Sequence, residues 1–172
     1  MRDIVLSVFS GMLVYVLLKK NRNTNTIQNA ICTITNGSVK GYVLLQRIKH
    51  NQTRLSCFLH NLTPGEHGFH IHNKGDLREN CKSVCSHYNP HKSQHGGSIG
   101  NKRHEGDLGN LTANENGLSN TIITSDVRLD DIIGRSIVIH EYPDDLGMGK
   151  NQESLTTGNS GRRIGCGVIG LL

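Results

Sequence analysis

Short segments rich in Ile, Val, Leu and Thr make up most of the chain after about residue 30, and several of them alternate apolar with polar positions. Gly, Asn, Asp or Pro residues bound each segment. Strands place successive side chains on opposite faces, so each segment predicts a strand with one face on a core. The pattern predicts an all-β domain, with strands at residues 30–34, 39–48, 53–62, 67–73, 117–125 and 134–142.

Two long stretches between these segments, residues 73–104 and 143–163, show little periodicity. Loops of this length in a compact domain are usually functional or disordered. The first overlaps the stretch from Gly68 to Gly97, which holds five of the ten histidines of the chain. We therefore expect the chemistry of the protein to lie in this part of the chain.

The N-terminus departs from the strand pattern. Residues 4–18 form an uninterrupted apolar to weakly polar run, which Lys19, Lys20 and Arg22 follow. The run is shorter than the roughly 20 residues of a spanning helix. It predicts a hydrophobic targeting or anchor segment over residues 1–22.

A polar linker over residues 23–29 would join this segment to a single domain over residues 30–172. Three fates of the segment stay open: it is retained for membrane association, it is cleaved as a signal peptide, or it is neither. The usual small-residue cleavage pattern is missing, and positive residues after the run place the following domain on the cytoplasmic side. This distribution favours a cytoplasmic, membrane-associated protein over a secreted one.

Composition and charge narrow the function classes only a little. The 172 residues suit one domain with a real core, and 20 glycines with 4% aromatic residues suit many short elements joined by turns. The formal charge of +5 divides into +3 for the first 22 residues and +2 for the rest. Basic runs with interleaved aromatic residues are missing, so no nucleic-acid partner is expected.

Histidines in two predicted strands could reach a single metal ion. His70 and His72 are two residues apart, so a strand would point both imidazoles to one face. The alternative for this pair is two ordinary polar residues on an exposed strand face. His140 lies in a second alternating segment. The intervening chain adds further candidate ligands: His87, His91, His95, His104 and Asp107.

These candidates divide by ligand type, because an all-histidine set suits copper whereas a carboxylate among histidines is ordinary for zinc. The cysteines do not fit a zinc-finger pattern. Cys81 and Cys85 are spaced C-x3-C without a second pair, and Cys166 stands alone near the end of the chain. Disulfide bonding of at least one pair is the better interpretation.

A series of segments resembles, in order, the signature segments of the copper/zinc superoxide dismutases: HGFHIH, SHYNPHKSQHGG, RHEGDLGNLTA, VIHEYPDDLG and ESLTTGNSGRRIGCGVIG. The resemblance covers about residues 30–172. It implies an immunoglobulin-like Greek-key β-sandwich or barrel of about eight antiparallel strands with two long functional loops. It also implies an enzyme that converts superoxide to oxygen and hydrogen peroxide, with one copper and one zinc ion per subunit.

Taken position by position, the resemblance implies two metal sites that share His87. A bridging imidazolate has lost both ring protons, which two flanking cations make reasonable near neutral pH. When copper is reduced, His87 would release it and take up a proton for peroxide formation. The implied copper ligands are His70, His72, His87 and His140, and the implied zinc ligands are His87, His95, His104 and Asp107.

The resemblance also implies roles for residues that hold no metal. Asp144 would accept hydrogen bonds from His70 and His95 and so orient both rings. Arg163 would attract and orient the superoxide anion at the mouth of the copper channel. The implied disulfide ties the ligand-bearing loop to the last strand through Cys81 and Cys166.

Among the departures of the chain from the family, three bear on the disulfide, the substrate and the dimer. Cys85 stands where a small residue is usual, and it is either a free thiol or a competitor for the partner of Cys81. Thr156 replaces a lysine that steers the substrate, so we expect altered steering. Lys74 replaces an aromatic residue of the family's dimer interface, although a homodimer remains the expectation.

Partners follow from the same resemblance. Superoxide would be the substrate, and a copper chaperone could load the metal. The alternative function is a copper-chaperone-type or membrane-tethered metal-binding module without dismutase activity. The complete histidine set and Arg163 argue against that alternative. Four histidines are expected to bind no metal: His50, His60, His67 and His91.

Overall fold

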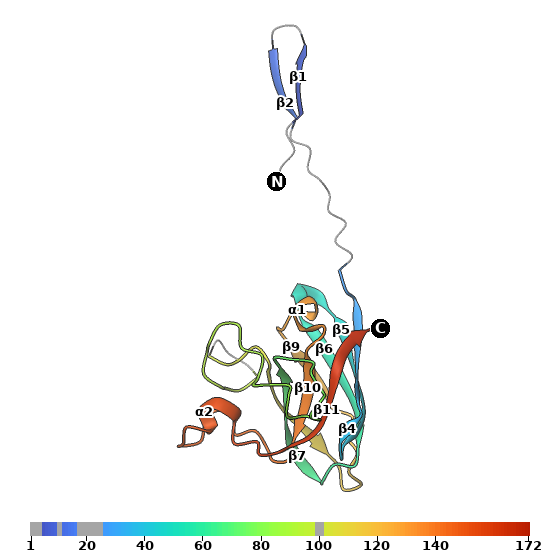
Figure 1. Cartoon of the computed structure of the whole chain (residues 1–172), viewed down its shortest axis with the longest axis vertical. Coiled ribbons are helices and arrows are strands. Elements are labelled where there is room, and N and C mark those ends of the chain that lie inside the picture. Colours follow the sequence, from blue (N-terminus) through green and yellow to red (C-terminus); the bar gives the residue numbers. More distant parts are fainter. Residues whose placement is uncertain (1–4, 10–11, 17–25, 99–101) are drawn as a thin grey trace.

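The computed structural model describes residues 5–9, 12–16, 26–98 and 102–172 (Figure 1). In the first two ranges, β1 (Val5–Phe9) and β2 (Met12–Val16) pair as an antiparallel hairpin. No helix within the described ranges is long and apolar enough to cross a membrane. Much of the predicted anchor segment and linker lies outside the described residues, and the N-terminal assignment stays a prediction.

Antiparallel strands build the rest of the chain into one barrel. Their order is β8-β7-β10-β11-β3-β5-β6-β9, and β4 pairs with β11 off this path. The helices are short: η1 (Lys49–Asn51), α1 (Leu129–Ile132) and α2 (Ser154–Thr157). The strands are β3 (Asn29–Ile34), β4 (Asn36–Gly37), β5 (Lys40–Arg47), β6 (Thr53–His60), β7 (Gly65–His72), β8 (Asp107–Ala113), β9 (Ile122–Ser125), β10 (Ser136–His140) and β11 (Arg163–Leu171).

Strand β11 belongs to both halves of the barrel. Its first part pairs with β10 as far as Val168, and its last part pairs with β3 from Ile169 onward. The two edge strands approach each other near Thr121, whose hydroxyl accepts a hydrogen bond from the Thr112 amide at 3.2 Å. The chain crosses between the halves from β6 to β7, from β8 to β9 and from β9 to β10. The predicted fold class, a Greek-key barrel of eight antiparallel strands, is confirmed.

Five of the six predicted strands lie within about two residues of their expected limits, whereas β9 covers only the second half of the predicted range 117–125. Three strands of the barrel were not predicted from alternation: the two-residue β4, β8 and β11. Strand β11 contains glycines where side chains would mark a strand face. A Cβ atom on Gly167 would lie 2.0 Å from the Thr33 carbonyl oxygen of the adjacent strand β3. Close backbone contact, and not a side-chain pattern, therefore determines this strand.

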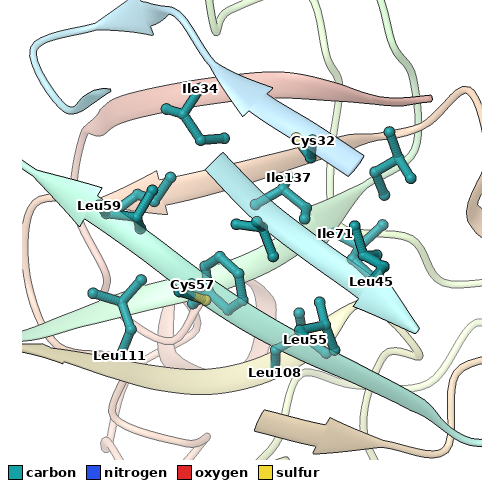
Figure 2. Close-up of a cluster of buried hydrophobic side chains, with 14 of the residues drawn as sticks. Cys32, Ile34, Leu45, Leu55, Cys57, Leu59, Ile71, Leu108, Leu111 and Ile137 are labelled. Carbon is teal, nitrogen blue, oxygen red and sulfur yellow. The ribbon is translucent and has the colours of Figure 1, made fainter. Parts of the chain in front are cut away.

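The barrel interior is filled by aliphatic side chains such as Leu45, Ile71 and Ile137 (Figure 2), and Phe69 belongs to the same buried cluster. Alternation along β6 buries Leu55, Cys57 and Leu59, whereas Ser56 between them is half-buried and Phe58 is exposed. Cys32 and Cys57 are core residues as predicted, and burial raises the pKa of both thiols to about 12. Both thiols are therefore neutral and sheltered near pH 7.

Both predicted long loops are present, and Figure 1 shows them projecting on the same side of the barrel. One joins β7 to β8 over residues 73–106, and the other joins β10 to β11 over residues 141–162. The loops contact each other directly, because the His95 amide donates to the Leu155 carbonyl oxygen at 2.9 Å. A Cys81–Cys166 disulfide ties the first loop to β11, as the resemblance implied.

Candidate metal centre

Four histidines gather on the outer face of the barrel where β7 meets β10. His70 and His72 are on β7, two residues apart and on one face. His140 ends β10, which pairs with β7 so that Val138 lies opposite His70. The first long loop supplies His87, which forms a β-bridge with His72. One ring nitrogen from each of the four histidines lies within 4.8 Å of those of the others.

Three of these rings are held by a hydrogen bond at one nitrogen only. His70 Nε2 bonds the Asp144 carboxylate at 2.7 Å. His72 Nδ1 bonds the Cys85 carbonyl oxygen at 2.8 Å, and His140 Nδ1 bonds the Gly161 carbonyl oxygen at 3.2 Å. The opposite nitrogens are buried and have no hydrogen-bond partner among the described residues. Buried unpaired nitrogens are costly. These nitrogens belong to side chains whose candidate ligand atoms lie within 4.8 Å of one another, which fits a bound cation.

A second cluster lies beside the first and shares His87. His87 Nδ1 is 2.8 Å from Asp107 Oδ1, and Nδ1 of both His95 and His104 is 3.1 Å from the same oxygen. Ligand atoms of a tetrahedral zinc site, at about 2.0–2.1 Å from the ion, lie roughly 3.3 Å apart. The spacing of this cluster therefore fits a tetrahedral metal site with three imidazoles and one carboxylate.

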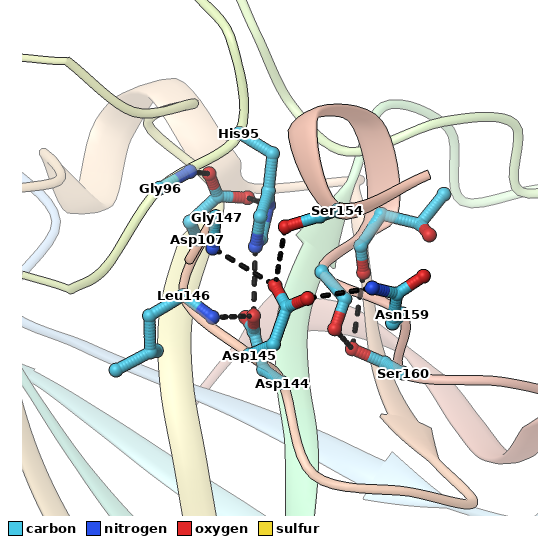
Figure 3. A network of polar contacts seen from close by, with 12 residues as sticks. His95, Gly96, Asp107, Asp144, Asp145, Leu146, Gly147, Ser154, Asn159 and Ser160 are labelled. Atoms are coloured by element: carbon cyan, nitrogen blue, oxygen red, sulfur yellow. Dashed lines mark hydrogen bonds and ion pairs between the residues drawn. The ribbon is translucent and has the colours of Figure 1, made fainter. Parts of the chain in front are cut away.

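Asp144 connects the two clusters, and Figure 3 shows its contact with His95 of the second. Its Oδ2 accepts from His70 Nε2 at 2.7 Å and its Oδ1 accepts from His95 Nε2 at 2.8 Å. The Asn110 side chain holds the Asp144 backbone through two hydrogen bonds. Its Nδ2 donates to the Asp144 carbonyl oxygen at 2.9 Å, and its Oδ1 accepts from the Asp144 amide at 2.7 Å. A Cβ atom on Gly158 would lie 2.0 Å from Asp144 Oδ1, so only glycine fits there.

The neighbouring Asp145 holds the second long loop together, a role that sequence reasoning missed. Its carboxylate accepts from Ser154 Oγ at 2.9 Å, from Asn159 Nδ2 at 2.6 Å and from the Gly147 amide at 3.0 Å (Figure 3). These contacts fold the loop beside Asp144. In the sequence, the position of Asp145 next to Asp144 was the only signal that could have indicated this role.

Burial keeps the histidines of the first cluster neutral. It holds the pKa of His70 and His72 well below the usual range, and proximity to His87 lowers both further. Burial also lowers the pKa of His140 to about 4. A neutral imidazole keeps the lone pair that a metal ion needs.

His95 differs from the first cluster because carboxylates face both of its ring nitrogens. Burial opposes its charge, but hydrogen bonds to Asp107 and Asp144 raise its pKa to about 9. Asp107 shows the matching effect: burial opposes its charge, yet bonds from three histidines lower its pKa below the usual range. The second cluster is therefore a buried, charge-balanced site, suited to a divalent cation that replaces the protons.

Arg163 lies beside the first cluster at the start of β11, opposite His140 in the strand register. Its guanidinium is held in place by three backbone carbonyls of the first loop. One amino nitrogen donates to Cys81 at 2.8 Å and to Lys82 at 3.1 Å, and the other donates to Cys85 at 2.7 Å. The positive charge is close enough to lower the pKa of His72 and His140, after burial and the other contacts.

The remaining histidines lie outside both clusters, as expected. His91 is exposed, and its Nε2 contacts Glu105 Oε1 at 2.7 Å. His67 is buried, with its ring nitrogens 2.8 Å from the His140 carbonyl oxygen and 2.9 Å from the Thr63 carbonyl oxygen. His67 therefore supports the backbone of a cluster residue. His50 and His60 are exposed.

Thr156, which replaces the expected steering lysine, lies in α2 and is exposed. Its hydroxyl donates to the Gln152 and Glu153 carbonyl oxygens at 3.2 and 3.1 Å. It therefore completes the helix and adds no charge to the loop surface. Lys150 is exposed on the same loop.

Comparisons with known proteins agree on one family. A family model described as copper/zinc superoxide dismutase matches residues 39–169. A Cu-Zn superoxide dismutase of Paramecium bursaria Chlorella virus 1 is 42% identical over 166 residues, which are 92% of this chain and 88% of the relative. An extracellular Cu-Zn superoxide dismutase of Drosophila melanogaster is 47% identical over 142 residues, 79% of this chain and 78% of the relative. The crystal structure of the clock protein EA4 is similar, with a TM-score of 0.82 and 38% identity over 86% of this chain and 96% of that one.

Proposed function

This chain belongs to the copper/zinc superoxide dismutase family, and on that premise we propose which residues bind each metal and which handle the substrate. The protein is an enzyme that converts superoxide to oxygen and hydrogen peroxide, and its cofactors are one copper and one zinc ion. The residue roles below rest on the geometry of the two clusters.

The first cluster binds copper and the second binds zinc. An all-imidazole set suits copper, and three imidazoles with one carboxylate suit zinc. One observation carries the assignment: buried, unpaired nitrogens of His70, His72 and His140 converge within the first cluster. His87 belongs to both sets, with Nδ1 on the side of Asp107.

The histidines of the first cluster would hold copper, which would supply the change between two oxidation states that oxidises one superoxide ion and reduces the next. The residues of the chain supply position and protons. His87 can hold a proton at its nitrogen on the side of the first cluster, where peroxide formation consumes one. The hydrogen bonds of His72 and His140 to backbone carbonyls set their tautomers, so that Nε2 of each faces the cluster.

Arg163 attracts and orients the substrate. Superoxide is a small anion, and a guanidinium fixed by three carbonyls offers it a charge without further loss of side-chain freedom. The backbone opposite Arg163 carries His140, a proposed copper ligand. The anion would therefore meet the positive charge beside the copper cluster.

Substrate steering predicts a dependence on salt. The second-order rate constant of the full, metal-loaded chain should fall as ionic strength rises, because salt screens attraction between Arg163 and superoxide. Thr156→Lys should raise the rate constant at low salt, by up to about tenfold, because it restores a positive charge to the loop. Thr156→Ser is the matched control and should leave it unchanged. A rate constant that does not fall with ionic strength would contradict steering.

Asp144→Asn should lower zinc affinity by about 10–100-fold, because an amide cannot accept hydrogen bonds from both His70 and His95. A competition titration against a chromophoric chelator measures this affinity. Asp76→Asn is a suitable control, since Asp76 pairs only with the exposed Arg78. Equal zinc affinities of the two variants would rule out the proposed role of Asp144.

Partners beyond superoxide also belong to the proposal. A homodimer is supported by two exposed apolar residues, Leu171 at the end of β11 and Leu172 after it. Lys74 is exposed where the family's interface has an aromatic residue, and light scattering would report the resulting subunit number. Copper loading by a chaperone and membrane association through residues 4–18 complete the proposed set.

A non-enzymatic metal-binding module, the alternative function, is not favoured. A module of that kind commonly lacks part of the copper set, whereas His70, His72, His87 and His140 gather here with Arg163 beside them. The similarity of most of the chain to superoxide dismutases also favours the enzyme over the non-enzymatic module.

A further inference from the structure

Three cysteines lie where the first long loop meets β11. Cys81 is bonded to Cys166, and both are buried in a small apolar cluster with Val84 and Val138. Cys85 is four residues after Cys81 and keeps a free, half-buried thiol. The metal sites and the substrate site use the Cys85 carbonyl but leave its thiol without a role.

The backbones of Cys81 and Cys85 are held close together by one side chain. The two amino nitrogens of the planar Arg163 guanidinium donate to the Cys81 carbonyl at 2.8 Å and to the Cys85 carbonyl at 2.7 Å. The residues between the two cysteines form turns and no extended strand. The backbone that carries the free thiol is thus held near the backbone of disulfide-bonded Cys81.

The backbone at Cys85 is strained. Its φ angle is 65°, in the left-handed region that glycine adopts freely and residues with a Cβ atom adopt at a cost. While the Cys81–Cys166 disulfide is in place, the backbone of the free Cys85 therefore has an unfavourable conformation. A rearrangement that moves Cys85 can relieve this strain.

We propose that the Cys81–Cys166 disulfide exchanges with the Cys85 thiol, so that the protein has a second disulfide isomer, Cys81–Cys85. The Cys85 thiolate attacks Sγ of Cys81 and forms the new S–S bond. The bond from Cys81 to Cys166 breaks, and Cys166 leaves as a thiolate that takes the proton given up by Cys85. One disulfide and one thiol are present before and after, so no external oxidant or reductant is needed.

The exchange alters both stability and the active site. The second isomer has no covalent tie between the first loop and β11, and the five-residue ring that it closes constrains the unfolded chain far less than the native link. Exchange also displaces the Cys85 carbonyl, which accepts hydrogen bonds from His72 and Arg163. The position of the disulfide is therefore coupled to a proposed copper ligand and to the substrate-binding cation.

Trypsin separates the three cysteines, so peptide mapping can distinguish the isomers. Cleavage after Arg78, Lys82, Lys92 and Arg163 puts each cysteine on its own peptide: residues 79–82, 83–92 and 164–172. The full, metal-loaded chain is incubated without added thiol or oxidant, quenched in acid, labelled with N-ethylmaleimide and mapped by mass spectrometry.

We expect two products together: peptide 79–82 linked to peptide 83–92, and maleimide on Cys166. Both should be lost in Cys85→Ser and in Cys85→Gly, whose glycine suits the observed φ angle. Both should persist in Cys57→Ala, the matched control that removes a buried free thiol. The proposal is overturned if wild-type protein yields only the Cys81–Cys166 link with labelled Cys85, or if Cys85→Ser labels Cys166 equally.

Discussion

Replacing Cys81 and Cys166 together by serine should lower the free energy of unfolding by about 4 kcal/mol. The native disulfide closes a loop across a sequence separation of 85, and removing it restores conformational freedom to the unfolded chain. Cys166 is also fully buried, so its serine replacement leaves a hydroxyl in an apolar cluster. Urea denaturation of the metal-free proteins, without reductant, measures the difference.

Cys85→Ser is the control for this double variant, because it changes a cysteine of the same loop and leaves the native link in place. Its denaturation midpoint should lie close to that of the wild-type protein. If the double variant and Cys85→Ser unfold at the same urea concentration, the disulfide contributes no stability and the chain-entropy argument does not apply here.

His140→Ala should abolish most of the dismutase activity, by at least about a hundredfold, since even contacts outside the ligand set change affinity or activity by 10–100-fold. His140 is proposed to supply one of four imidazoles, with its unpaired Nε2 directed into the first cluster. The second cluster does not include His140, so zinc should remain bound. Metal analysis and a superoxide consumption assay on the same sample test both statements.

His60→Ala provides the comparison, because His60 is an exposed histidine at the end of β6, outside both clusters. It should keep both metals and full activity. A His140→Ala protein that retains copper and activity would show that the proposed copper set is wrong. Loss of zinc along with copper would contradict the prediction that the second cluster, which lacks His140, binds zinc without copper.

Most of the barrel could be predicted because its strands expose one face and bury the other, as β6 does with Leu55, Cys57 and Leu59. Alternation failed for β11, where Gly167 is required by the approach of the Thr33 carbonyl. It also failed for β8, where Asp107, Leu108 and Gly109 are all buried in succession. Strands that serve a site or a tight backbone contact lose the periodic signal.

The residues of the candidate site could be named in advance because the resemblance extends over successive segments, and the structure gathers them into two clusters. Apart from those of Asp144, their supporting contacts could not be named. The rings of His72 and His140 are oriented by carbonyls of Cys85 and Gly161, and any residue has a carbonyl. Contacts to the backbone carry no signature in residue type.

The N-terminal run shows a different limit. An uninterrupted apolar run has neither a helical nor a strand period, so residues 4–18 could not be assigned from periodicity. The structure pairs Val5–Phe9 with Met12–Val16 as strands, and the remainder lies outside the described residues. Targeting or anchoring by this segment stays a prediction.

The single carboxylate of Asp144, which holds His70 with one oxygen and His95 with the other, links the thermodynamics of the two metals. In the proposed assignment, a zinc ion that fixes His95 would also fix Asp144, and with it the ring of His70, a proposed copper ligand. Copper then binds to a preorganised ligand and loses less conformational entropy on binding. Because binding free energies are reciprocal, copper must strengthen zinc binding by the same factor. Metal loading of this protein should therefore be cooperative, with the half-loaded forms less populated than independent sites would allow.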